Sequence, residues 1–160
     1  DLSKSAGGVV RVELCHPDQM PDLSRFEGKC LDELDITVDD YQPAPHLLCV
    51  GKNKVAQELY SHLLKSNCPV TGQPDWASIQ VQYKGLEIDR EGLLKYFISY
   101  REHGDFHEQC VENIFMDIWQ RCQPESLTVY ARYVRRGGLD INPVRSSEPV
   151  KSLNLRLSRQ

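Results

Sequence analysis

Two predicted helices lie side by side in the middle of this sequence, and they constrain its fold more than any other feature. In residues 111–122 apolar side chains recur every three or four positions, which is the period of a helix with one buried face. This stripe consists of Val111, Ile114, Phe115, Ile118, Trp119 and Cys122. A shorter helix precedes it, with Asp89 as its expected N-cap and Gly104 as its stop. The wide stripe predicts a helix that packs across a sheet.

Segments in which apolar and polar residues alternate lie on both sides of these helices. Such a period of two indicates strands. The segments are residues 10–14, 34–38, 77–83, 127–133 and 153–157. Helices grouped between strands are typical of an α+β protein that has two helices on one face of an antiparallel sheet.

Residues 54–65 fit either a helix or a strand. Their apolar residues Val55, Leu59 and Leu63 recur at helical spacing, and this spacing alone favours a helix.

Length, charge and cysteine content exclude several classes of protein. A chain of 160 residues is long enough for one well-buried core, and a net charge of −4 provides no basic field for nucleic acid. No apolar run approaches the roughly 18 residues of a membrane span, and no signal peptide is recognisable, so we expect a cytoplasmic protein without a membrane partner. The six cysteines include no C-x-x-C pair, which predicts reduced thiols and no structural zinc site.

Cys68 and Asp75 stand seven residues apart across a turn that contains Pro69, Gly72 and Pro74. A thiolate adds to an electrophilic carbon, and a nearby carboxylic acid can protonate the heteroatom that becomes negative. The turn residues fit a compact loop that brings both side chains to one side. An inert buried thiol beside an ordinary Pro-Asp turn explains the same residues.

A second cluster, Asp105, Phe106, His107 and Glu108, precedes the strongest helix. Asp105 with Glu108 three residues later is close to a capping box, so helix capping accounts for both acids. Capping requires neither the aromatic ring nor the imidazole, which leaves Phe106 and His107 as candidate site residues.

A third cluster, Arg135, Arg136, Gly137 and Gly138, ends the strand predicted over residues 127–133. A solvated basic strand end before a glycine turn is one interpretation. Phosphate binding is the other, because arginine binds phosphate bidentately and glycine lets the backbone approach closely. No G-x-G-x-x-G fingerprint accompanies the cluster, so a Rossmann site is not indicated.

Taken together and in this order, the three clusters resemble those of the NADPH-dependent nitrile reductases of queuosine biosynthesis. The resemblance implies a tunnelling fold (T-fold), in which modules associate side by side so that their sheets join into a barrel. It also implies a strand over residues 54–65, and a homo-oligomer.

The same resemblance assigns roles to individual residues. It implies that the thiolate of Cys68 attacks the nitrile carbon of 7-cyano-7-deazaguanine to form a thioimide, and that Asp75 protonates the nitrogen. Phe106, His107 and Glu108 are implied to bind this deazapurine, and His107 also to manage protons. NADPH then supplies two hydrides, with Arg136 and Gly137 as its expected contacts. No metal is required.

One signature of these reductases is missing. Their Glu-Ser-Lys-Ser run at the first helix contacts the cofactor and the substrate, whereas residues 89–96 here read DREGLLKY. The similarity is closest to the C-terminal module of the two-module reductases. We therefore expect residues 51–160 to form the catalytic module, preceded by a strand and loop segment over residues 1–50. The absence of an initiator methionine adds to the expectation that an N-terminal module of the same enzyme is the missing partner.

Two other functions stay open on the sequence. A zinc-dependent purine or pterin cyclohydrolase of the same fold would use cysteine and histidine as metal ligands. A non-catalytic module would bind a purine-like ligand or complete an oligomeric barrel.

Overall fold

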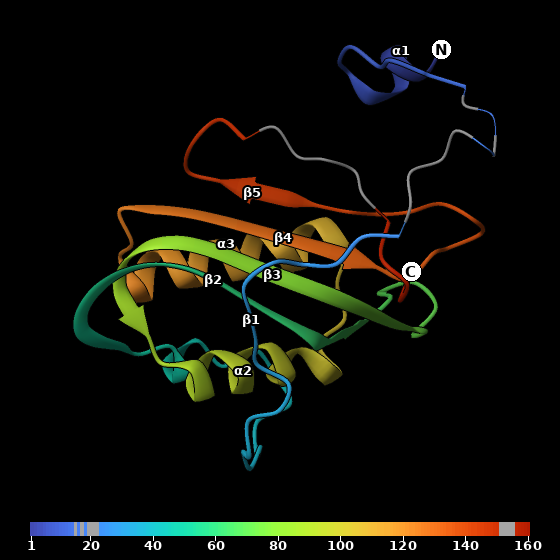
Figure 1. The fold of residues 1–160 in the computed structure, drawn as a ribbon. Coiled ribbons are helices and arrows are strands. Elements are labelled where there is room, and N and C mark those ends of the chain that lie inside the picture. Colours follow the sequence, from blue (N-terminus) through green and yellow to red (C-terminus); the bar gives the residue numbers. More distant parts are fainter. Residues whose placement is uncertain (15, 17, 19–22, 151–155) are drawn as a thin grey trace.

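The computed structural model describes residues 1–14, 16, 18, 23–150 and 156–160. A five-stranded sheet in the order β1-β2-β3-β4-β5 carries two long helices on one face (Figure 1). The strands are β1 (Lys29–Cys30), β2 (Val50–Asn67), β3 (Pro74–Ile88), β4 (Ser126–Tyr133) and β5 (Val144–Ser146). The helices are α1 (Leu2–Ala6), α2 (Arg90–Ser99) and α3 (His107–Cys122), with single 3-10 turns η2 (Pro45–Leu47) and η3 (Tyr100–Glu102). The predicted α+β class is confirmed.

The sheet is antiparallel except at one edge, where β1 pairs with β2 in parallel. Residues 54–65 belong to β2, so the helix that their spacing favours is wrong and the strand implied by the family resemblance is confirmed. The apolar spacing is misleading because the pairing of β2 with β3 shifts its register between Ser61 and Leu64. Ser61 is buried before the shift and Leu64 after it, so the apolar residues lose their strict period of two.

The core fills the space between the sheet and the helices α2 and α3. Its largest fully buried side chains are Tyr96, Tyr100, Tyr133, Phe97, Leu31, Leu48, Leu59, Leu64, Ile79, Ile88, Leu93 and Leu94. The predicted strand over residues 127–133 is confirmed as β4, which buries alternate residues in this core.

Both helix predictions are confirmed in their main features. Asp89 caps α2, because its Oδ2 accepts a 2.8 Å hydrogen bond from the N–H of Gly92. However, α2 ends at Ser99, ahead of the expected stop at Gly104, and η3 continues the chain. The stripe of α3 faces the core as predicted, and α3 ends at Gln123, which adopts a left-handed conformation with φ 48°.

Two predicted strands in the first fifty residues are wrong. Residues 10–14 form no ladder, and Leu14 is 97% exposed. Residues 34–38 do alternate in burial, because Leu34, Ile36 and Val38 pack partly against the core, but no strand pairs with them. The alternation reflects contact between these side chains and the core. Such contact does not require that the segment pair with a neighbouring strand.

The ends of the sheet differ from the prediction in other ways. The short strands β1 and β5 were not predicted. Residues 153 and 155 of the predicted last strand lie outside the described residues, while Leu157 is buried and forms an isolated bridge with Ser24. The segment before residue 50 is joined to the rest of the fold, since it supplies β1 and the buried Leu31 and Leu48.

Candidate active site

Three chain segments that are far apart in sequence meet at one end of the sheet (Figure 1). The first is the turn between β2 and β3, which contains Cys68. The second is the N-terminus of α3, where His107 is the first helical residue. The third is the turn after β4, which contains Arg136. Ionic contacts to Asp75 connect all three.

The Cys68 turn is closed by its own backbone. The N–H of Cys68 donates to the carbonyl of Gln73 and the N–H of Gly72 donates to the carbonyl of Cys68, each at 2.8 Å. Gly72 has φ 69°, a conformation that side chains with a Cβ rarely adopt. Cys68 is half-buried as a result, and its sulfur is not enclosed in the core.

Asp75 lies beneath this turn and is 1% exposed. Its Oδ1 accepts hydrogen bonds from Nε of Arg136 at 2.8 Å and from Nη2 at 2.5 Å. Its Oδ2 lies 3.0 Å from Nε2 of His107. The carboxyl group is thus held between a guanidinium group and an imidazole, as a buried charge requires.

His107 is 6% exposed and lies flat on the ring of Tyr133, with 4.0 Å between ring centroids and 8° between ring planes. This stacking aims Nε2 at Asp75. The expected capping role of Asp105 is wrong: Phe106 is the N-cap residue, and no side chain caps the helix. Asp105 instead accepts a hydrogen bond from the N–H of Phe106.

Arg136 connects the two halves of the predicted Cys68 and Asp75 pair. Besides Asp75, its guanidinium donates to Oε1 of Gln73 at 3.0 Å. Its partner in the motif, Arg135, pairs with Asp140 instead, at 2.7 Å. Arg136 therefore joins Asp75 to Gln73, whose carbonyl accepts the N–H of Cys68.

The turn after Arg136 has the conformation that its glycines permit. Gly137 has φ 56° and Gly138 has φ 82°, and Arg136 and Leu139 exchange backbone hydrogen bonds across them. No described atom lies within 4 Å of where a Cβ would stand on either glycine. The backbone of this turn is open to an approaching ligand.

The environment of Cys68 favours its thiolate. Hydrogen bonds from the Thr71 hydroxyl, and then from the N–H groups of Thr71 and Val70, lower the pKa of the thiol, and the charge of Arg136 adds to them. Burial acts in the opposite direction with less effect. By contrast, burial raises the pKa of Cys110 and of Cys122 to about 11, so these two core thiols stay protonated.

Phe106 and Glu108 lie on either side of His107, and both are exposed, Phe106 by 59%. The side chain of Glu108 makes no hydrogen bond or ion pair in the part of the chain that the structure describes. Their side chains are therefore available to a ligand. Thr71, Gln73 and Tyr133 were not predicted as site residues, and the sequence signals only Thr71 and Gln73, through their position within the cysteine motif.

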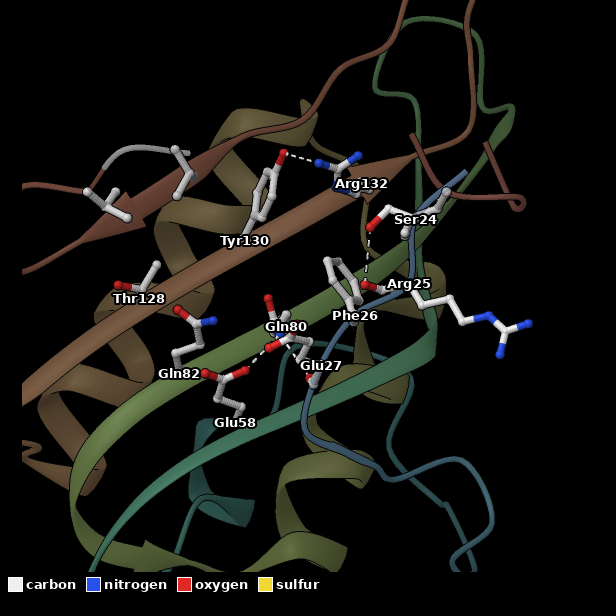
Figure 2. Close-up of a pocket in the computed structure, with 13 residues that line it drawn as sticks. Ser24, Arg25, Phe26, Glu27, Glu58, Gln80, Gln82, Thr128, Tyr130 and Arg132 are labelled. Atoms are coloured by element: carbon white, nitrogen blue, oxygen red, sulfur yellow. Dashed lines mark hydrogen bonds between the residues drawn. The ribbon is translucent and has the colours of Figure 1, made fainter. Parts of the chain in front are cut away.

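A hollow in the described part of the chain lies elsewhere. It has a volume of about 320 Å³ and lies on the face of the sheet away from α2 and α3, where Glu58, Gln80 and Tyr130 line it (Figure 2). None of the predicted site residues lines it. Within the described residues we find no group of three or more side chains that could hold a metal ion, and no helix that could cross a membrane.

Comparison with known proteins identifies relatives over the whole chain. The sequence model of a family described as QueF-like protein matches residues 74–152. The chain is 56% identical to the NADPH-dependent 7-cyano-7-deazaguanine reductase of Bordetella avium (strain 197N), over 100% of the chain and 60% of that relative. It is 55% identical to the reductase of the same name from Verminephrobacter eiseniae (strain EF01-2), over 98% of the chain and 57% of the relative. The chain thus spans about 60% of the length of these relatives.

The fold also matches a solved structure. A crystal structure of the archaeosine synthase QueF-Like in the apo form superposes with a TM-score of 0.53 and 19% sequence identity, covering 63% of this chain and 99% of that one. This likeness supports the T-fold arrangement predicted from the sequence.

Proposed function

We propose that this chain, which is homologous over its full length to the NADPH-dependent 7-cyano-7-deazaguanine reductases, carries the nucleophile and the proton donor of such an enzyme. The observation that supports this best is the buried pair of Asp75 and His107, which Arg136 joins to Gln73 in the Cys68 turn. The homologues favour the reductase over the cyclohydrolase and over a non-catalytic module.

In the first step, the Cys68 thiolate forms a bond to the nitrile carbon. One π bond of the nitrile breaks, its electron pair moves to nitrogen, and nitrogen takes a proton, which gives a neutral thioimide. We propose that Asp75 passes this proton to the nitrogen from Nε2 of His107, which lies 3.0 Å from its Oδ2, so that Asp75 is the immediate donor and His107 the source of the proton.

Phe106 and Glu108 are proposed to bind the deazapurine. Phe106 offers an exposed apolar ring to the flat base. The exposed carboxylate of Glu108 can accept hydrogen bonds from the ring N–H and the exocyclic amine of a guanine-like edge. Both stand next to His107, so a base held between them lies beside the proton donor.

The turn over residues 135–139 fits a cofactor phosphate, because it combines the guanidinium groups of Arg135 and Arg136 with open backbone at Gly137 and Gly138. Two NADPH molecules bound there in turn would each supply one hydride, and with protons taken up at nitrogen these would convert the thioimide to the aminomethyl product and release the Cys68 thiolate. Arg136 and Gly137 are our proposed contacts. We infer that another module supplies the remaining contacts, in a homo-oligomeric barrel, and that the enzyme is cytoplasmic and acts on the free base without nucleic acid.

Intact mass spectrometry of the 160-residue chain with 7-cyano-7-deazaguanine tests this proposal. We expect an added mass equal to that of the ligand in the wild type, and none in Cys68→Ala. The variant Asp75→Asn should form the adduct much more slowly, because it has no acidic proton to give. An unchanged wild-type mass at saturating ligand would contradict the assignment of Cys68.

A further inference from the structure

We infer that Arg136 is a positioning residue for the proton donor, because its guanidinium holds Asp75 against the turn that carries Cys68 and needs no cofactor to do so. The inference deepens the proposed function and rests on it for the identity of the nucleophile and the acid. It assigns Arg136 to the formation of the thioimide. That step joins sulfur to carbon and moves one proton to nitrogen without a change in oxidation state, so it requires no hydride.

The guanidinium of Arg136 uses all of its nitrogens inside the site. Nε and Nη2 donate to Oδ1 of Asp75 at 2.8 and 2.5 Å, and Nη1 donates to Oε1 of Gln73 at 3.0 Å. Because each Nη atom of a guanidinium carries a pair of N–H groups, one N–H on each is not used by these bonds. Arg136 can therefore hold the acid and still face a cofactor phosphate.

The bond to Arg136 fixes which oxygen of Asp75 faces which partner. Oδ1 lies against the guanidinium, and this leaves Oδ2 at 3.0 Å from Nε2 of His107. Asp75 is 1% exposed, so without Arg136 its Oδ1 would be buried with no donor among the described residues. The carboxyl group would then turn toward another donor or admit water. Either change moves the acid away from the place where it meets the nitrile nitrogen.

Gln73 connects Arg136 to the turn of the nucleophile. Its side chain accepts the bond from Arg136, and its carbonyl accepts the N–H of Cys68 at 2.8 Å. Gln73 is exposed, so packing in the core does not fix its side chain. The main chain of Arg136 is itself held by reciprocal backbone bonds with Leu139. One planar group thus fixes the acid relative to the loop of the nucleophile.

The neighbouring Arg135 has a different environment. It pairs with Asp140 at 2.7 Å, and their side chains are 30% and 27% exposed. Neither residue contacts Asp75 or the Cys68 turn through a hydrogen bond or ion pair in the described part of the chain. The two arginines of the motif therefore divide the work, and Arg136 is the one that serves the acid.

The test is the rate of thioimide formation without NADPH, measured by intact mass spectrometry of the 160-residue chain at increasing concentrations of 7-cyano-7-deazaguanine. Arg136→Ala should lower the limiting rate by about tenfold to a hundredfold, because a misplaced acid loses most of its effect. The ligand concentration that gives half the limiting rate should stay nearly the same, since Phe106 and Glu108 are the proposed contacts of the base. Arg145→Ala is the matched control, because it breaks an arginine–carboxylate pair with Glu112 in another part of the fold.

Free guanidinium separates a positioning role from damage to the fold. Guanidinium ion added to Arg136→Ala at concentrations that leave the circular dichroism spectrum unchanged can occupy the vacated place, and it should raise the rate of adduct formation. Ammonium ion should not, because it lacks the planar fork. Arg136→Lys keeps the charge but has a single nitrogen that cannot reproduce the bonds to both Asp75 and Gln73, so it should also be slow. This variant decides the question if Arg136→Ala does not fold.

A wild-type rate of adduct formation in these variants, with turnover of NADPH lost, would overturn the inference and leave Arg136 as a cofactor contact alone. A slow rate that guanidinium does not raise in folded Arg136→Ala would overturn it as well. If the wild type itself forms no adduct, the proposed function fails, and a double-mutant cycle decides on Arg136. The fall in Tm caused by Arg136→Ala should then be smaller in an Asp75→Asn background, and equal falls would refute the role.

Discussion

Replacement of Asp75 by asparagine is expected to destabilise the fold. Asp75 is 1% exposed, and its carboxyl group lies in contact with the guanidinium of Arg136 and the imidazole of His107. Asparagine keeps the shape of the side chain but not its charge. The side chain of Arg136 is 26% exposed, so water can hydrogen-bond to it once the carboxylate is lost. We therefore assign the loss of this contact about 1 kcal/mol. His107 is 6% exposed and adds about 1.5–2 kcal/mol. We therefore expect the free energy of unfolding to fall by about 2.5–3 kcal/mol.

This loss corresponds to a fall in Tm of about 5–12 °C for a chain of this size. Urea denaturation followed by tryptophan fluorescence measures it, with Asp140→Asn as the matched control. That variant breaks the pair between Arg135 and Asp140, whose side chains are 30% and 27% exposed, and should cost less than about 1 kcal/mol. If Asp75→Asn costs no more than Asp140→Asn, the buried network does not hold the site together as argued.

Three further predictions follow from other contacts. Tyr133→Leu removes the ring under His107 and should lower the free energy of unfolding by about 2–4 kcal/mol. Tyr133→Phe should lower it by less than about 1 kcal/mol, since the hydroxyl has no hydrogen-bond partner among the described residues. Equal losses for the two variants in thermal melts would contradict this prediction. Cys110 and Cys122 have a pKa of about 11 in the folded chain, so between about pH 9 and pH 11 the folded chain keeps two protons that the unfolded chain has lost. The free energy of unfolding should therefore fall over this pH range. It should fall less in a variant with alanine at both positions. Glu108→Gln should leave Tm unchanged but weaken deazapurine binding by about tenfold or more in calorimetry, and unchanged affinity would remove Glu108 from the proposed site.

The fold was predictable wherever one face of an element meets the core. The stripes of α2 and α3 and the alternation in β4 all mark the core face correctly. The prediction failed where the pattern of buried side chains does not match the pairing of strands. Residues 34–38 alternate without a strand partner, and β2 hides its alternation behind a register shift.

The site was predictable as a set of residue types and less so as an arrangement. Cys68, Asp75, His107 and Arg136 were named from three motifs, and the structure joins His107 and Arg136 through Asp75. The pairing of Arg136 with Asp75 was not predicted, because these residues stand 61 positions apart.

By itself, the sequence determined the chemistry that is available: an apolar pattern that requires helices on one face of a sheet, a cysteine in a turn of prolines and glycine, and an acid seven residues later. Local spacing carries this information because helix and turn geometry relate residues only a few positions apart. Tertiary structure alone decided which groups touch. The pairing of β2 with β3 and of β3 with β4 brings Arg136 and His107 to Asp75, and the stack on Tyr133 aims the imidazole. These contacts depend on strand register and helix packing, which no short stretch of sequence specifies.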